Sequence, residues 1–168
     1  MAKSEDYLKE AFAGESQANR KYLAFATQAK HEGHPQVARL FLAAAEAETI
    51  HAHNHLRALK AIGNTTANLK EAIAGETHEF TKMYPEMLEA AKAEGNKDAE
   101  RSFSYALQVE KVHGALYTAA RAGLGSPGTP TEQFAYFVCP VCGYTAERHA
   151  PDVCPVCGAK GSVFKKIE

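Results

Sequence analysis

The sequence predicts an all-α four-helix bundle followed by a small domain of short strands and turns that a bound metal holds together. Three observations support this prediction. Four long stretches with helical apolar spacing fill most of the first 122 residues, two Glu-x-x-His motifs recur within them, and all four cysteines follow as two Cys-x-x-Cys pairs. With 168 residues, the chain has room for one bundle of about 120–130 residues and a small appendage.

The four predicted helices have recognisable boundaries. Pro35 starts the second helix, because proline is favoured in a first turn. Gly33, Gly63 and Gly95 follow the first three helices, as expected of residues that end helices. Pro85 lies inside the third helix and is expected to kink it, because proline removes a helical hydrogen bond. The helices are therefore predicted at about residues 5–32, 35–62, 67–94 and 98–122.

The composition changes abruptly after residue 122. Residues 123–130 (GLGSPGTP) are rich in glycine and proline, which is typical of a linker. From Phe134 onward, short aromatic and β-branched runs alternate with the Cys-x-x-Cys turns, and this segment is too small to form a core of its own. We therefore expect a helical domain at residues 1–122, a linker at 123–133 and a metal-stabilised domain at 134–168.

Charge and hydropathy exclude several classes of protein. The formal net charge is -1 and no cluster of lysine or arginine stands out, so nucleic-acid binding has no electrostatic support. No apolar run approaches the roughly 20 residues that span a bilayer. The first residues (MAKSEDYLKE) are charged from the third position and do not form a signal peptide, so a cytoplasmic location is expected.

The helical part repeats itself. The motif AGES at residues 13–16 reappears as AGET at residues 74–77, 61 residues later. The Glu-x-x-His motif at residues 48–51 reappears at residues 110–113, 62 residues later. The sequence therefore predicts two related helical hairpins, each with a glutamate on its first helix and Glu-x-x-His on its second.

The repeated motifs predict a carboxylate-rich metal centre. Residues three apart share a helix face, so each Glu-x-x-His pair points to one side. Two lone glutamates and two Glu-x-x-His pairs form the ligand set of di-iron and di-manganese bundles. Carboxylates offset the charge of two cations, while imidazoles bind them without adding charge. Glu79, one turn after Glu76, adds a carboxylate that would let one iron change ligands. The predicted ligands are Glu15, Glu48, His51, Glu76, Glu79, Glu110 and His113.

Solvent-exposed glutamates with chance histidines are the alternative interpretation of these motifs. One Glu-x-x-His motif alone would not exclude it, but two copies at matched spacing favour metal binding. Tyr22 and Tyr84 follow the lone glutamates by seven and eight residues, about two helical turns along the same face. We expect both tyrosines to hydrogen-bond the ligand carboxylates, with a place among core aromatics as the alternative.

The two Cys-x-x-Cys pairs predict a second metal site. Each pair reads Cys-Pro-Val-Cys-Gly, and the glycine permits the left-handed backbone that lets amides face the sulfurs. Four thiolates in a tetrahedron suit either zinc or iron. The adjacent di-iron motifs favour iron, because an electron-transfer site has a use beside a redox centre. The predicted ligands are Cys139, Cys142, Cys154 and Cys157.

Together these motifs resemble the rubrerythrin family, whose members join a ferritin-like di-iron bundle to a C-terminal rubredoxin-like domain. The resemblance covers essentially the whole chain. It rests on AGESQA at residues 13–18, GETHEFTKMYP at residues 75–85, the two Glu-x-x-His motifs and the paired cysteine knuckles.

The resemblance also implies roles for individual residues. The implied assignments are Glu48 and Glu110 as bridges between the irons, Glu15 and Glu79 on one iron, and Glu76 and His113 on the other. The first iron of the family exchanges a glutamate for a histidine on reduction, which here would be Glu79 and His51. The expected catalytic residues are Glu79, His51, Tyr22 and Tyr84.

The activity implied by the resemblance is reduction of hydrogen peroxide to water in oxidative-stress defence. Electrons would come from a reductase or a rubredoxin-type donor and enter through the four-cysteine iron. A ferroxidase or iron-storage protein is one alternative, although storage needs no dedicated electron donor. A non-enzymatic metal-binding module with zinc at the four cysteines is the other.

The connection between the second and third helices is unusually short. These helices run parallel in a ferritin-like bundle, so the connection must return along both. The helix from Glu48 to residue 62 and the helix from residue 67 to Glu76 are together about 35 Å long, and the connection must span this length to bring the two glutamates to one level. Five extended residues reach only about 17 Å. We therefore expect a homodimer in which helical hairpins are exchanged between chains. The alternative is that a helix unwinds early and the bundle closes within one chain.

Overall fold

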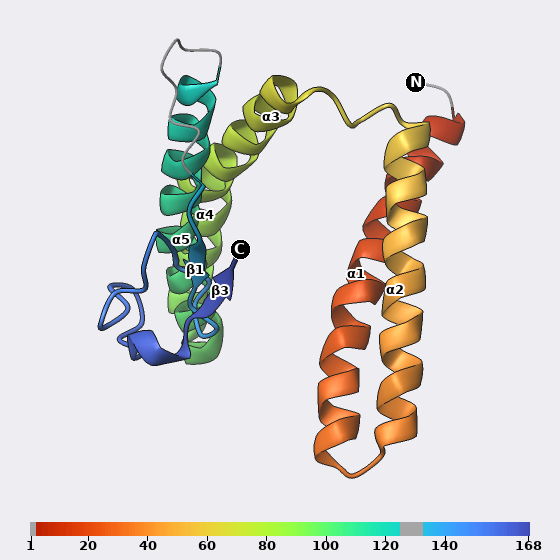
Figure 1. The fold of residues 1–168 in the computed structure, drawn as a ribbon, viewed down its shortest axis with the longest axis horizontal. Helices are drawn as coiled ribbons and strands as arrows, with labels where there is room; N and C mark the ends of the chain where they lie inside the picture. Colours follow the sequence, from red (N-terminus) through yellow and green to blue (C-terminus); the bar gives the residue numbers. More distant parts are fainter. Residues whose placement is uncertain (1–2, 125–132) are drawn as a thin grey trace. The chain divides into compact units, whose positions relative to one another are not determined.

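The computed structural model describes residues 3–124 and 133–168, and the chain divides into two compact units, residues 1–63 and 64–168. The first unit is an antiparallel hairpin of α1 (Lys3–His31) and α2 (Pro35–Ala58), which lie side by side in Figure 1. Both helices start close to their predicted positions. Gly33 turns the chain between them with a φ of +81°, a conformation that L side chains rarely adopt.

Small residues let the two helices of this hairpin approach closely. The buried positions along their contact are Ala26, Ala29, Ala38, Ala45 and Ala52. A buried amide joins the helices as well: Asn19 Nδ2 donates hydrogen bonds to the Ala45 carbonyl at 2.7 Å and to Thr49 Oγ1 at 2.8 Å. Removing such a buried amide costs about 1–3 kcal/mol, since its partners lose their hydrogen bonds.

The second helix ends earlier than the sequence predicts. Its last residue is Ala58, whereas the apolar pattern suggested an end near Ile62. The Ala61 amide donates a hydrogen bond to the Leu56 carbonyl, and the Lys60 amide donates one to the Arg57 carbonyl. Lys60 itself takes a φ of +54°. This is the Schellman arrangement, usually made with glycine, and no glycine marks it here. The connection to the next helix is therefore residues 59–64.

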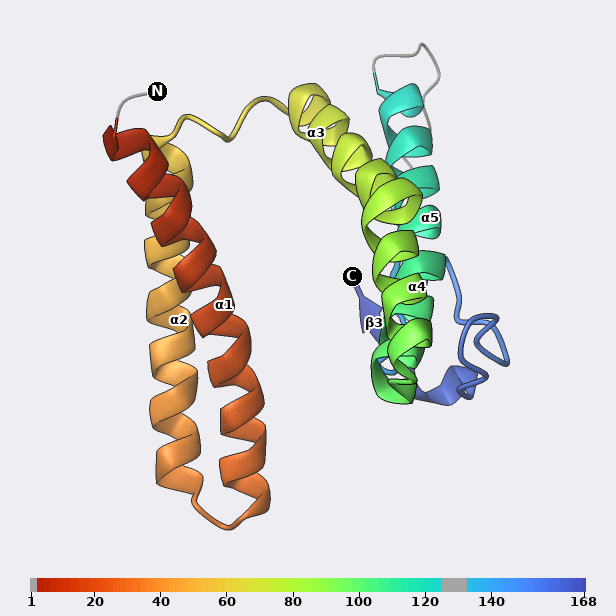
Figure 2. The ribbon, with the colours of Figure 1, turned by 180° about the vertical axis from the view of Figure 1, so that it is seen from behind.

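The second unit begins with one long helix in three parts. These are α3 (Thr65–His78), the π-helical turn η1 (Glu79–Met83) and α4 (Tyr84–Glu94), which continue one another beside α5 (Lys97–Gly123) in Figure 2. Asn64 and Asn96 cap α3 and α5 by accepting hydrogen bonds from backbone amides. A π-helical turn lies just before Pro85, which stands in the first turn of α4, and the kink expected at this proline stays a prediction.

A small antiparallel sheet completes the second unit. Its strands are β1 (Tyr136–Val138), β2 (Thr145–Glu147) and β3 (Lys165–Ile167), in the order β2-β1-β3, and β2 contacts α5. A 3-10 turn, η2 (Gly161–Val163), precedes β3. The predicted fold class is thus confirmed: a mostly helical chain with a small three-stranded region that carries the four cysteines.

Two further expectations concern the ends of the domains and the membrane. Most of the predicted linker, residues 125–132, lies outside the described residues, and the division at residues 122 and 134 stays a prediction. Within the described ranges, every helix is too short or too polar to cross a bilayer.

Candidate metal centres

The first hairpin brings together three of the predicted ligands. Glu15 from α1 meets Glu48 and His51 from α2, with ligand atoms within 4.8 Å of one another. His51 Nδ1 lies 2.9 Å from Glu48 Oε2 and 4.0 Å from Glu15 Oε1. The i, i+3 spacing on α2 places the glutamate and the histidine on one face, as the sequence predicts.

The second unit repeats this geometry. Glu76 from α3 meets Glu110 and His113 from α5. His113 Nδ1 lies 2.7 Å from Glu110 Oε2 and 4.0 Å from Glu76 Oε1, nearly the distances found in the first hairpin. We call the cluster of Glu15, Glu48 and His51 the first half-site, and the cluster of Glu76, Glu110 and His113 the second half-site. The repeat in the sequence is therefore a repeat in structure.

Glu79 belongs to the π-helical turn and has no counterpart in the first hairpin. Seven residues separate Glu15 from Tyr22, but eight separate Glu76 from Tyr84. One inserted residue in a helix produces a π-helical turn, and η1 lies inside that longer interval. Glu79 lies outside the cluster of Glu76, Glu110 and His113, so its role as a metal ligand stays a prediction.

Negative charge accumulates in the second half-site. Burial, followed by the charge of Glu110, raises the pKa of Glu76 to about 7. Burial and the same neighbour also raise the pKa of Glu79. The pKa of the Tyr84 hydroxyl is raised by burial and by the carboxylates of Glu79 and Glu110. A bound cation would relieve this repulsion, and oxygen with imidazole ligands suits iron.

The two predicted tyrosines pack among aromatic rings. Tyr22 lies 6.0 Å from Phe41 and 6.3 Å from Phe25 between ring centroids, and Tyr84 lies 6.3 Å from Phe103. Among the residues that the structure describes, neither hydroxyl has a hydrogen bond to a ligand carboxylate. Their predicted role beside the metal therefore stays a prediction.

One contact in the second half-site was not predicted from the sequence. His113 Nε2 lies 3.0 Å from Thr145 Oγ1 of β2. The side chain of His113 is 27% exposed, whereas that of His51 is 53% exposed. The only signal in the sequence is the position of Thr145, two residues after the glycine of the first cysteine knuckle.

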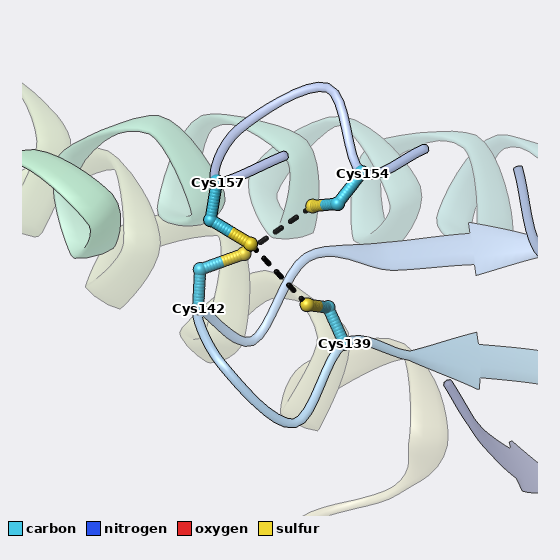
Figure 3. A group of neighbouring side chains, drawn as sticks. All are labelled: Cys139, Cys142, Cys154 and Cys157. Atoms are coloured by element: carbon cyan, nitrogen blue, oxygen red, sulfur yellow. Dashed lines mark hydrogen bonds between the residues drawn. The ribbon is translucent and has the colours of Figure 1, made fainter. Parts of the chain in front are cut away.

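The four cysteines converge on one point (Figure 3). Two sulfur pairs, Cys139 with Cys157 and Cys142 with Cys154, lie 3.5 Å apart. This exceeds the roughly 2.05 Å of a disulfide, and it is close to the edge of about 3.8 Å of a tetrahedron with metal–sulfur bonds of about 2.3 Å. The cysteines therefore fit a single tetrahedral metal ion.

The two knuckles have matching backbones. Gly143 and Gly158 take φ values of +86° and +76° and donate to the carbonyls of Cys139 and Cys154, respectively. Burial disfavours the Cys154 thiolate, but backbone hydrogen bonds from Cys157 and Val156 outweigh it and lower the pKa of this thiol to about 7. These amides stabilise the negative charge that a metal-binding sulfur carries.

Comparison with protein families gives two matches that together span most of the chain. The family model described as Rubrerythrin matches residues 6–121. The model described as Rubrerythrin, rubredoxin-like domain, matches residues 137–165. The first match contains both half-sites, and the second contains all four cysteines.

Individual relatives agree with these matches. The chain is 38% identical to Rubrerythrin-2 of Clostridium acetobutylicum, over 86% of this chain and 85% of the relative. It is 39% identical to Rubrerythrin of Porphyromonas gingivalis, over 85% and 78%, and 35% identical to Nigerythrin of Nitratidesulfovibrio vulgaris, over 82% and 73%. A solved structure of fully reduced, all-ferrous nigerythrin aligns with a TM-score of 0.59 at 31% identity, covering 99% of this chain and 88% of that chain.

The raised pKa of Glu76 predicts how stability depends on pH when the half-sites hold no metal. Its folded pKa of about 7 exceeds the ordinary 4.5, so between these values the folded protein binds a proton that the unfolded chain releases. The free energy of unfolding should therefore fall as the pH rises from about 4.5 through 7. Urea unfolding of metal-stripped protein across this range measures it.

The Glu76→Gln variant is the control, because it cannot titrate at this position. The drop in stability with rising pH should be larger in the wild type than in the variant. Equal slopes in the two proteins would contradict the assignment.

Proposed function

The chain belongs to the rubrerythrin family, and from that premise we propose that it is a di-iron peroxidase that reduces hydrogen peroxide to water. Rubrerythrins bind iron and are generally oxidoreductases. The observation that carries the proposal is the presence, in one chain, of two matching carboxylate–histidine half-sites and a four-cysteine site. Four free thiols placed for a metal also suit a reducing compartment, and we propose a cytoplasmic location.

The chemistry divides between the metal and the protein. When bound, the two irons supply the two electrons that cleave one O–O bond. Glu48 and Glu110 would hold the irons from the two hairpins, and Glu79 and His51 would be the two alternative ligands of one iron. Reduction of peroxide to two waters also consumes two protons. The Tyr84 hydroxyl, whose pKa is raised first by burial, keeps its proton at neutral pH and is the proposed proton donor.

The four-cysteine site is the proposed entry for electrons from a reductase or a rubredoxin-type donor. One iron held by four thiolates passes single electrons, which suits the stepwise re-reduction of a two-electron centre. A storage or ferroxidase protein has no use for such a donor. Zinc at the four cysteines would remove this function, because zinc has no redox chemistry.

We further propose that each di-iron centre joins the first half-site of one chain to the second half-site of its partner. Along the helices, Glu48 lies about 15 Å from Ala58, and Glu76 lies about 16 Å from Thr65, so a parallel return needs about 31 Å. The connection from Ala58 to Thr65 reaches at most about 24 Å when fully extended. The Schellman turn around Lys60 shortens this reach further. A chain therefore cannot complete its own centre while α2 and α3 stay intact.

The Cys142→Ser variant tests the division of labour between the sites. Donor-linked peroxide consumption should be abolished, because electrons no longer enter, while one oxidation of chemically pre-reduced di-iron sites by peroxide should persist. Stopped-flow spectroscopy and a coupled peroxide assay measure the two steps. Val141→Ala, at the exposed neighbouring position, is the control and should behave as wild type.

Two observations on the wild-type protein would contradict the proposed function. One is wild-type protein that mineralises iron with dioxygen but does not consume peroxide, which would indicate a ferroxidase. The other is a colourless four-cysteine site with stoichiometric zinc, since Fe(Cys)4 in its ferric state is red.

Complementation between two inactive variants tests the exchange of hairpins. Glu48→Ala damages the first half-site and Glu110→Ala damages the second, so neither variant alone has an intact centre. In an exchanged heterodimer the two damaged half-sites meet each other, and the two undamaged ones form one intact centre. Equal co-expression should therefore restore about a quarter of the wild-type centres, measured as iron content and peroxide turnover.

The control is co-expression of Glu48→Ala with Glu15→Ala, which damage the same half-site and should not complement. Recovery no greater than this control in the Glu48→Ala and Glu110→Ala pair would show that each centre comes from a single chain.

A further inference from the structure

The small sheet places one hydroxyl against a predicted iron ligand. Thr145 Oγ1 lies 3.0 Å from His113 Nε2 and donates to the Gly143 carbonyl at 3.1 Å. Gly143 directly follows Cys142. The hydrogen bonds from Thr145 to His113 and to Gly143, with the peptide bond between Gly143 and Cys142, therefore connect the second half-site to the cysteine knuckle. Thr145 is part-buried in this arrangement, at the start of β2.

The direction of these hydrogen bonds suits a metal-bound imidazole. His113 Nδ1 faces the carboxylates of its half-site, so a ring that binds a cation through Nδ1 carries its proton on Nε2. The Thr145 hydroxyl donates its own hydrogen to the Gly143 carbonyl. Its oxygen can therefore accept a hydrogen bond from the Nε2–H group of His113. Such partners fix the orientation of a ligating histidine and strengthen metal binding.

The place of Thr145 depends on the knuckle around it. Thr145 pairs with Val138, the residue before Cys139, and Gly143 packs toward the buried Val109 of α5. The sheet has three residues per strand, and Cys139 and Cys154 are buried within its domain. So small a domain relies on its metal for order, and loss of that metal would release Thr145 from His113.

We propose that Thr145 is a positioning residue for His113, through which the metal at the four cysteines strengthens iron retention in the second half-site. The coupling is reciprocal, because two sites linked by one interaction affect each other's binding equally. The inference rests on the proposed metal centres and not on the peroxidase reaction. It assigns the cysteine domain to the di-iron centre that contains His113 of its own chain.

The first half-site provides a comparison within the same protein. Within a single chain, the His51 side chain is more exposed than that of His113, and across residues 3–124 and 133–168 of that chain no side chain hydrogen-bonds its Nε2 atom. The iron on the His51 side should therefore be insensitive to changes at Thr145. The two irons should differ in how fast they leave the protein.

Release of ferrous iron to a chelator tests the proposal without any catalytic turnover. In Thr145→Val, which keeps the shape but lacks the hydroxyl, release of one of the two di-iron ions should accelerate about tenfold or more. In Thr145→Ser, which keeps the hydroxyl, release should stay close to that of the wild type. The visible spectrum of the four-cysteine iron, unchanged in both variants, shows that the small domain remains folded.

Loss of the cysteine metal should have the same effect as loss of the hydroxyl. Cys142→Ser should accelerate release of the same ion, and adding Thr145→Val to it should change little, since both substitutions remove one interaction. Unchanged release in Thr145→Val, or equal acceleration in the serine variant, would overturn the proposal. Failure of peroxide reduction would leave the release data, and so this inference, unaffected.

Discussion

We propose that the length of one connection, residues 59–64, prevents a single chain from completing a di-iron centre. Each hairpin presents two carboxylates and one imidazole, which is half of a two-metal ligand set. Residues 59–64 are too few to return along both flanking helices, and a Schellman turn consumes part of them. Cations bound between two half-sites would offset the carboxylate charge, and we propose that the connection determines which copies can pair. An exchanged dimer satisfies both requirements without unwinding either helix.

The two half-sites share a geometry but not an environment. Both histidines approach their neighbouring glutamates at nearly the same distances. The second half-site has two additions: the π-helical turn that carries Glu79, and the contact between His113 and Thr145. Of the two proposed ligand histidines, His113 has a hydroxyl beside its Nε2 atom, and His51 is more exposed within the chain. This difference would give a physical reason for the proposed ligand exchange to involve His51 and not His113.

Local patterns in the sequence were sufficient for much of this description. The spacing of apolar residues predicted the helices, and the two repeats identified the six residues that the structure gathers into half-sites. The paired Cys-x-x-Cys motifs identified the four cysteines. The early end of α2 was missed because Lys60 occupies a left-handed position that usually takes glycine, while Leu59 and Ile62 continue the apolar pattern. Thr145 was missed because its partner is 32 residues away and only the folded sheet brings them together. The π-helical turn was not predicted, although the sequence contains a sign of it. Tyr84 follows Glu76 by eight residues, whereas Tyr22 follows Glu15 by seven, which reveals one inserted residue.

We propose that each di-iron centre is assembled from two chains. A crystal structure of the iron-loaded protein, with continuous density through residues 59–64, tests this assembly. If the assembly is correct, each pair of irons is bound by Glu15, Glu48 and His51 of one chain and by Glu76, Glu79, Glu110 and His113 of another. A centre whose ligands all belong to one continuously traced chain would contradict it.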